Sequence, residues 1–140
     1  MQDLDNQSLP SCLLRSESVS GLSGILALVK IDEVAKLKDN PEFLRGFSVQ
    51  ELELVRSRAK GHHSLAARYA AKQAAQALTG LPWTNFEIRR LTDQPPVLYL
   101  MNQAEAQEES LSTYFTISLS HDEPYALAYL VEIEVYPTTS

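Results

Sequence analysis

A ten-residue stretch near the middle of the chain, AARYAAKQAA from Ala66 to Ala75, most constrains what this chain can fold into. Six of the ten residues are alanine, which favours the helix more than any other residue. Because alanine has almost no side-chain bulk, a sheet or another helix can approach such a helix closely. The stretch therefore predicts a tightly packed core helix from about Ser64 to Leu78, with Gly80 placed to cap its C-terminal end.

Two cations, Arg68 and Lys72, lie four residues apart on this helix, with no acid between them at helical spacing. On an isolated helix such a like-charge pair costs roughly 0.2–0.5 kcal/mol. An anion such as a phosphate would turn this cost into a binding feature. The residues alone leave two interpretations open: an ordinary core helix, and a core helix that also binds an anion.

Composition limits the classes of protein that remain. The chain has 140 residues, which indicates one domain, and its net charge of −6 argues against non-specific binding to nucleic acid or to an anionic membrane. Cys12 is the only cysteine, so neither a disulfide within the chain nor a cysteine-based metal site is expected. The longest apolar run, Ile25 to Val29, is too short to cross a bilayer. No secretory leader opens the sequence, and we expect a cytoplasmic protein.

The chain divides into two parts by composition. Residues 1–22 are polar and rich in serine, which predicts a partly disordered N-terminal extension whose Leu13, Leu14 and Val19 dock on the domain. Residues 23–140 form the expected domain. In chain order we expect a strand at 24–31, a helical turn at 32–40, a helix at 48–60, the long helix, strands at 86–91 and 97–100, a helix at 102–111, and strands at 112–120 and 125–135. This order predicts an α+β domain with a mainly antiparallel sheet.

The spacing of the histidines does not by itself indicate a functional site. His121 stands in a turn between two expected strands, where a lone histidine is usually a surface residue. The adjacent His62 and His63 project in different directions and have no third ligand at a suitable spacing, so we interpret them as structural. Ser120, His121 and Asp122 are too close in sequence to form a hydrolytic relay.

Three segments in a fixed order do resemble a known family. They are VKIDEVAKL near the start, SLAARYAAKQA in the middle and TISLSHDEPYALAYLV near the end. Together they are similar to the holo-acyl-carrier-protein synthase group of 4′-phosphopantetheinyl transferases, over roughly residues 24–134. That family has a first strand of the form D-I-x-E-[IL]-x-R-[IL], a helix with [LF]-A-x-R-[FWY]-A-A-K-E-A, and a late S-[IL]-[ST]-H followed by Y-A-x-A.

The resemblance implies a fold in which a mainly antiparallel sheet packs on the alanine-rich helix. It implies chemistry in which coenzyme A is held by its phosphates, Mg²⁺ neutralises the pyrophosphate, and a carrier-protein serine attacks phosphorus. It places Arg68, Lys72, Ser120 and His121 at positions that line the coenzyme A pocket. It also implies a homotrimer with sites between subunits.

The chain departs from the family at both positions that supply carboxylates to Mg²⁺. Lys30 stands where the first-strand aspartate belongs, and Gln73 stands where the helix glutamate belongs. Since Mg²⁺ prefers carboxylate and phosphate oxygens, we expect no Mg²⁺ site and assign no catalytic residue at these two positions. Asp32, two residues after Lys30, is a weaker alternative ligand because it would act roughly 7 Å along the strand.

Three functions follow from the resemblance and its departures. The first is a non-catalytic protein that binds an unidentified protein partner as an adaptor, assembly factor or regulator. The second is an active transferase that moves the phosphopantetheine arm from coenzyme A to a carrier protein. The third is a coenzyme A sensor that keeps the pocket without the chemistry. We favour the first, with no cofactor required, and expect neither nucleic acid nor membrane as a partner.

Overall fold

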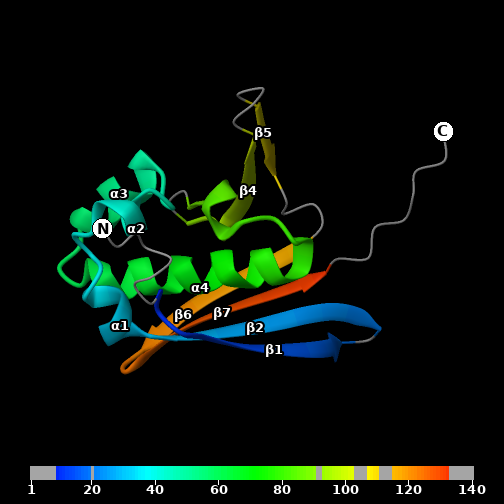
Figure 1. The fold of residues 1–140 in the computed structure, drawn as a ribbon. Coiled ribbons are helices and arrows are strands. Elements are labelled where there is room, and N and C mark those ends of the chain that lie inside the picture. Colours follow the sequence, from blue (N-terminus) through cyan, green and yellow to red (C-terminus); the bar gives the residue numbers. More distant parts are fainter. Residues whose placement is uncertain (1–8, 20, 91–92, 103–106, 111–114, 133–140) are drawn as a thin grey trace.

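A computed structural model describes residues 9–19, 21–90, 93–102, 107–110 and 115–132. Two antiparallel sheets lie on opposite sides of one long helix, α4, which runs through the middle of the molecule (Figure 1). The elements in chain order are β1 (Cys12–Val19), β2 (Leu22–Lys30), α1 (Ile31–Ala35), α2 (Pro41–Leu44), α3 (Val49–Arg56), α4 (Gly61–Thr79), η1 (Trp83–Asn85), β3 (Phe86–Arg89), β4 (Val97–Asn102), β5 (Gln107–Ser110), β6 (Phe115–Asp122) and β7 (Tyr125–Glu132).

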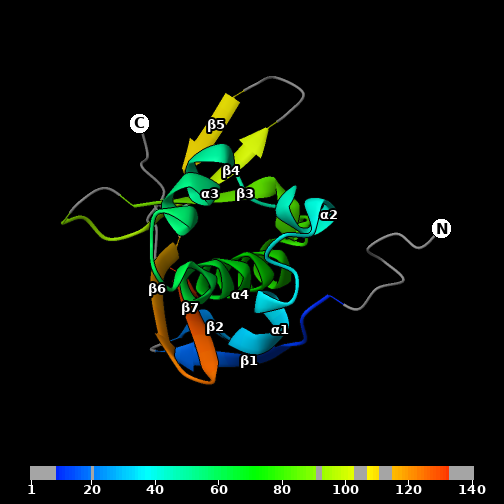
Figure 2. The same cartoon turned by 90° about the vertical axis from the view of Figure 1, so that its left-hand side faces the viewer.

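The larger sheet has the strand order β1-β2-β7-β6, and the smaller one has the order β3-β4-β5. Every pair of neighbouring strands is antiparallel. The expected α+β class, with a mainly antiparallel sheet packed on the alanine-rich helix, is therefore confirmed. In the view along α4 the larger sheet covers one side of the helix, while α3 and the smaller sheet lie on the other (Figure 2).

Small side chains meet where α4 packs on the larger sheet. Ala27, Ala126 and Ala128 of β2 and β7 are fully buried, and Ala27 pairs directly with Ala128 across the two strands. Ala70 and Ala74 of α4 are likewise fully buried. Alanine on both sides lets the helix axis come close to the sheet, so dispersion contacts form between the two backbones with few voids.

Large aromatic side chains fill the other side of α4. The rings of Phe43, Phe47, Tyr69 and Trp83 pack against one another with centroids 5.1 to 5.8 Å apart, from the helical segments α2 to α4 and η1. Gly46 lies under Trp83, and a Cβ atom added there would be 2.2 Å from the indole ring. Only glycine permits this close approach of backbone to ring.

Local chemistry sets the helix ends as the sequence predicts. Ser48 and Glu51 form the expected capping box at the start of α3, with each side chain accepting from the other residue's backbone N–H. Gly80 ends α4 in the left-handed conformation, with φ of 79°. Asn40, expected only as the end of a helical turn, also caps the short helix α2 ahead of Pro41.

The N-terminal segment differs from the expectation. Cys12–Val19, which we expected within a partly disordered extension, forms strand β1 and pairs with β2 along its full length. Its leucines do not dock as expected, since Leu13 is 68% and Leu14 is 45% exposed. Backbone hydrogen bonds to an open sheet edge, rather than apolar burial, hold this strand, which is why its polar composition hid it.

The type of secondary structure expected for residues 102–111 is also wrong. The segment 102–111 was expected to be a helix, but Gln107–Ser110 pairs with β4 as strand β5. Its glutamines and glutamates favour a helix in isolation, so tertiary pairing overrides a weak local preference. Residues 103–106 lie outside the described residues. Within the described parts of the chain, none of the helices has both the length and the apolar character needed to cross a bilayer.

The reactivity of Cys12 tests whether β1 is docked in solution. Burial raises the pKa of this thiol from 9.0 to about 11, opposed in part by a backbone hydrogen bond at Leu28. Because the thiolate is the reacting form, we expect alkylation of the native protein at pH 8 to be roughly 100-fold slower than in the urea-unfolded chain. The rate should then rise with pH up to about 11. Mass spectrometry over time measures both rates, and equal rates would contradict a docked β1.

Candidate functional site

A basic cavity lies beside α4, between the β6 edge of the larger sheet and the loop that follows α3. Its lining residues come from four separate parts of the chain. Three of them, Arg58, Arg68 and Arg90, are cations, and no described acid lines it. The complete lining is Arg58, Ser64, Ala67, Arg68, Arg90, Leu119, Ser120 and His121. Converging guanidinium groups of this kind suit a phosphate or another polyanion.

Arg68 is the buried cation of this cavity, with 4% of its side chain exposed. Its Nη1 donates to Ser64 Oγ at 2.8 Å. Its Nε lies 3.6 Å from Glu51 Oε2, outside hydrogen-bond geometry, and has no hydrogen-bond partner. Burial lowers the pKa of Arg68 and Glu51 opposes this, while Arg58 and Arg90 lower it further. Arg68 therefore brings a positive charge to the cavity wall, and Glu51 neutralises part of that charge.

The structure brings Ser120 and His121 to the same cavity, although their side chains differ in direction. Leu119, their neighbour on β6, packs on the core. Since side chains alternate along a strand, Ser120 points away from the face of the sheet that carries α4, and His121 points toward it. The His121 ring lies 5.1 Å from that of His63 on α4. His121 is thus the better placed of the two for binding a ligand in the cavity.

Lys72, the fourth residue expected at a coenzyme A pocket, lies elsewhere. Its side chain is fully buried, and its Nζ donates to Glu51 Oε1 at 2.6 Å and to the carbonyl of Gly46 at 2.7 Å. The Nζ also lies 4.4 Å from the centre of the Phe47 ring. Burial lowers the pKa of Lys72, and the carboxylate of Glu51 opposes that effect. Lys72 is a structural cation here and does not line the basic cavity.

The counter-ion of both helix cations is Glu51, which the sequence identified only as a capping residue. Its carboxylate is 2% exposed. Oε1 accepts from the Ser48 backbone and from Lys72, and Oε2 accepts from the Ile88 backbone at 3.2 Å. The like-charge pair on α4 therefore has an internal anion, supplied by α3 from a position 17 or more residues away in sequence.

The sequence places Arg58 and Arg68 in one short basic region but does not identify Arg90, the third arginine of the cavity. Arg90 follows β3 and Arg58 follows α3, so only tertiary folding brings them to Arg68. Arg58 belongs to a basic run in the sequence, which was the one available indication. The alternation of FEIRRL indicated a strand but did not show where its last arginine points.

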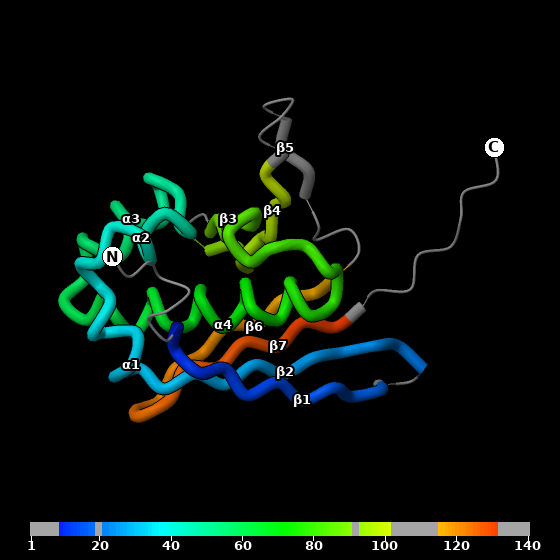
Figure 3. The backbone as a smooth tube through the Cα atoms, in the orientation of Figure 1, coloured from blue at the N-terminus to red at the C-terminus, as the bar shows by residue number. Residues whose placement is uncertain are grey.

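Lys30 and Gln73, the two departures from the family, lie near the N-terminal segment. Lys30 is exposed at the end of β2, and Gln73 follows Tyr69 by one turn on α4. Tyr69 Oη donates to the carbonyl of Pro10 at 3.0 Å, and the Ser11 N–H donates to Glu33 Oε1 at 2.8 Å. The chain just before β1 thus lies between α4 and α1, where the backbone trace also shows it (Figure 3).

The side chains at these two positions do not fit Mg²⁺. An ammonium at Lys30 repels a cation, and the amide of Gln73 offers one neutral oxygen. Glu33 Oε1 already accepts from Ser11. Asp32, the alternative ligand, belongs to the first turn of α1 rather than to the strand, so the expected strand-face placement is wrong.

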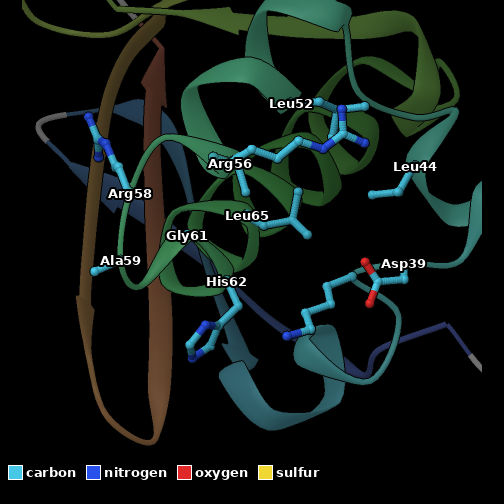
Figure 4. Close-up of a pocket in the computed structure, with 11 residues that line it drawn as sticks. Asp39, Leu44, Leu52, Arg56, Arg58, Ala59, Gly61, His62 and Leu65 are labelled. Carbon is cyan, nitrogen blue, oxygen red and sulfur yellow. The ribbon is translucent and has the colours of Figure 1, made fainter.

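A second cavity lies where α3, α4 and the loop after α1 meet, lined by Arg56, Arg58 and His62 among others (Figure 4). His62 stands at its edge, at the start of α4 (Figure 4). The expectation that His62 and His63 lack a third ligand is wrong, because Glu123 from the β6–β7 turn joins them within 4.8 Å.

Comparisons with known proteins agree with this architecture. A solved structure described as a Chronobacterium ammoniagenes ACPS-CoA complex matches with a TM-score of 0.61 and 25% identity, covering 81% of this chain and 98% of that one. The fold is therefore that of a 4′-phosphopantetheinyl transferase of the acyl-carrier-protein synthase type. A scan against models of known protein families finds no match.

Curated relatives identify the family. The holo-[acyl-carrier-protein] synthase of Moorella thermoacetica is 33% identical over 111 residues, which are 71% of this chain and 87% of the relative. The corresponding protein of Geobacter sulfurreducens is 32% identical over 115 residues, which are 76% of this chain and 90% of the relative. This chain belongs to the holo-[acyl-carrier-protein] synthase family.

Replacing Glu51 tests the buried charge network. Glu51→Gln keeps the shape of the side chain but leaves Lys72 as an uncompensated buried cation, so we expect a loss of about 3–5 kcal/mol in the free energy of unfolding. The matched control is Glu53→Gln, an exposed position on the same helix, which should change stability by no more than about 0.5 kcal/mol. Urea unfolding followed by circular dichroism measures both. Equal effects of the two substitutions would show that the network does not hold the fold.

Proposed function

We propose that this protein is a non-catalytic member of the holo-acyl-carrier-protein synthase family that works by binding a protein partner, as an adaptor, assembly factor or regulator. The observation that carries the proposal is the pair Lys30 and Gln73, at the positions that resemble the family's metal-binding carboxylates. Transfer of a phosphoryl-linked group needs positive charge fixed against the phosphate oxygens and the leaving oxygen. A flexible lysine and a neutral amide do not supply a coordinated ion.

The path of the N-terminal segment supports the same conclusion. Hydrogen bonds from Tyr69 to Pro10 and from Ser11 to Glu33 fix this segment beside Gln73. A pantetheine arm or a carrier serine approaching Gln73 would compete with those contacts. The segment belongs to the chain itself, so the competitor is always present at high effective concentration.

Strand β1 also supports a protein partner. It forms an open edge of the larger sheet, and its Leu13 and Leu14 are largely exposed. Open edges with exposed apolar side chains are places where another chain can add or pack. Co-purification from the native cell with identification by mass would name that protein. An assembly of three copies, as the family resemblance implies, also forms part of the proposal.

A second candidate function rests on the basic cavity. Coenzyme A carries several phosphates, and the cavity offers three arginines together with His121. The structurally similar ACPS protein was solved in complex with CoA. Binding of coenzyme A without transfer would make the protein a sensor, and this candidate is compatible with a protein partner.

A transfer assay tests the loss of catalysis. We expect no phosphopantetheine to be added to an apo-carrier protein when this protein is incubated with coenzyme A and Mg²⁺, because no carboxylate is available at positions 30 and 73. The holo-acyl-carrier-protein synthase of Moorella thermoacetica, run in parallel, is the positive control, and intact mass is the measurement. Robust transfer by the unmodified chain would favour the active-transferase alternative and rule out the proposal. The double variant Lys30→Asp with Gln73→Glu then shows whether the remaining site supports any transfer.

Calorimetric titration with coenzyme A in the absence of metal tests the second candidate. Arg58→Gln and Arg90→Gln should each weaken binding roughly 3–10-fold, since each removes one charge-assisted contact to phosphate, worth about 1 kcal/mol. Both are exposed, so the fold should tolerate either change. Arg45→Gln, an exposed arginine at the end of α2, is the matched control and should bind as the unmodified protein does. Affinities that do not differ among the three variants would exclude this cavity as the binding site.

A further inference from the structure

The three histidines of the chain meet at one place. His62 and His63 begin α4, and His121 stands near the end of β6, two residues before Glu123 in the β6–β7 turn. The ring centroids of His62 and His63 are 4.5 Å apart, and those of His63 and His121 are 5.1 Å apart. Neither the like-charge pair on α4 nor the basic cavity requires histidines at the helix start, so their gathering calls for a separate explanation.

Three side chains of this group converge closely enough to share one ion. One ligand atom each from His62, His63 and Glu123 lies within 4.8 Å of the others. His63 is 5% exposed, and its Nε2 lies 2.6 Å from Glu123 Oε1. This contact is an ion pair when the imidazole of His63 is protonated, and a bound cation would use the same two atoms as ligands.

Two imidazoles and one carboxylate form a set of ligands typical of zinc. Around a tetrahedral ion with bonds of about 2.0 Å, neighbouring ligand atoms lie about 3.3 Å apart, so adjustments of roughly 1 Å would complete the geometry. The structure allows such movement, because the Glu123 side chain is 64% exposed and can change rotamer. His63, in contrast, is held rigidly by burial and fixes where the ion would sit.

Nearby charges affect how strongly these three side chains attract a cation. Burial lowers the pKa of His62, and His63 and Lys38 lower it further, whereas Glu123 and Asp32 oppose them. The acids Glu123 and Asp32 favour a bound cation, while Lys38 opposes it.

We propose that His62, His63 and Glu123 form a binding site for a divalent transition metal, with Zn²⁺ as the expected ion and water or His121 in the fourth position. The site is distinct from the degenerate family positions, because His63 and Gln73 are ten residues apart on α4, about 15 Å along its axis. Since His63 packs against His121, the bound ion lies next to the wall of the basic cavity. This inference does not depend on whether the protein transfers phosphopantetheine.

Metal titration of the untagged protein, stripped with a chelator, tests the site. We expect one equivalent of Zn²⁺ to bind by calorimetry and one equivalent of Co²⁺ to give the intense visible absorption of tetrahedral coordination. His62→Gln and Glu123→Gln should each weaken Zn²⁺ binding by at least 10-fold, because each removes one ligand. Neither side chain is fully buried, so both variants should fold, which circular dichroism checks. Glu53→Gln is the matched control and should bind as the unmodified protein does.

Thermal unfolding tests the metal site by a second, independent measurement. Zn²⁺ that binds the folded state should raise the melting temperature of the unmodified protein and of Glu53→Gln, but not of His62→Gln or Glu123→Gln. Three results would overturn the proposal. They are no saturable binding, equal affinity in all four proteins, or a Co²⁺ spectrum that stays that of the octahedral aqua ion.

Discussion

The buried carboxylate of Glu51 is the interaction on which the rest of the structure depends. It accepts from the start of its own helix, from Lys72 on the central helix and from the backbone of β3, so one side chain ties together α3, α4 and the smaller sheet. An ion pair this deep contributes little net free energy when intact, because desolvation offsets most of the attraction. Its effect is on specificity: any packing of α3 that moved Glu51 away would leave Lys72 charged and unpaired in the core.

That network also decides how the charges of α4 are used. Lys72 is fully occupied by Glu51 and the Gly46 carbonyl, whereas Arg68 has a looser ion pair with Glu51 and also lines the basic cavity. Two cations one helical turn apart on a single face thus have different roles, one internal and one available to a ligand. The alanines between them matter equally, since they let the larger sheet come close enough to place His121 beside the start of the helix.

The molecule keeps the fold of its family while its two sides carry different chemistry. On the β1 side, Lys30 ends β2, and the chain's own N-terminal segment is hydrogen-bonded to Tyr69 and Glu33. On the β6 side, arginines and histidines gather around the start of α4. A fold that loses one set of ligands can keep its core unchanged, because the core is built from the alanine and aromatic faces of α4 rather than from the site. This separation makes a binding role on the same scaffold physically reasonable.

The sequence by itself determined the central helix, the capping box at Ser48 and the left-handed cap at Gly80. It also determined the family and the strands from β2 to β7 apart from β5. Each of these features rests on local periodicity, turn chemistry or short motifs. It identified Arg68 and His121 through the resemblance. Tertiary structure alone decided that Lys72 is internal, that Arg58 and Arg90 join Arg68, that Glu123 joins His62 and His63, and that Cys12–Val19 is a strand. These facts depend on pairings between residues distant in sequence, and neither composition nor periodicity records which distant residues will meet.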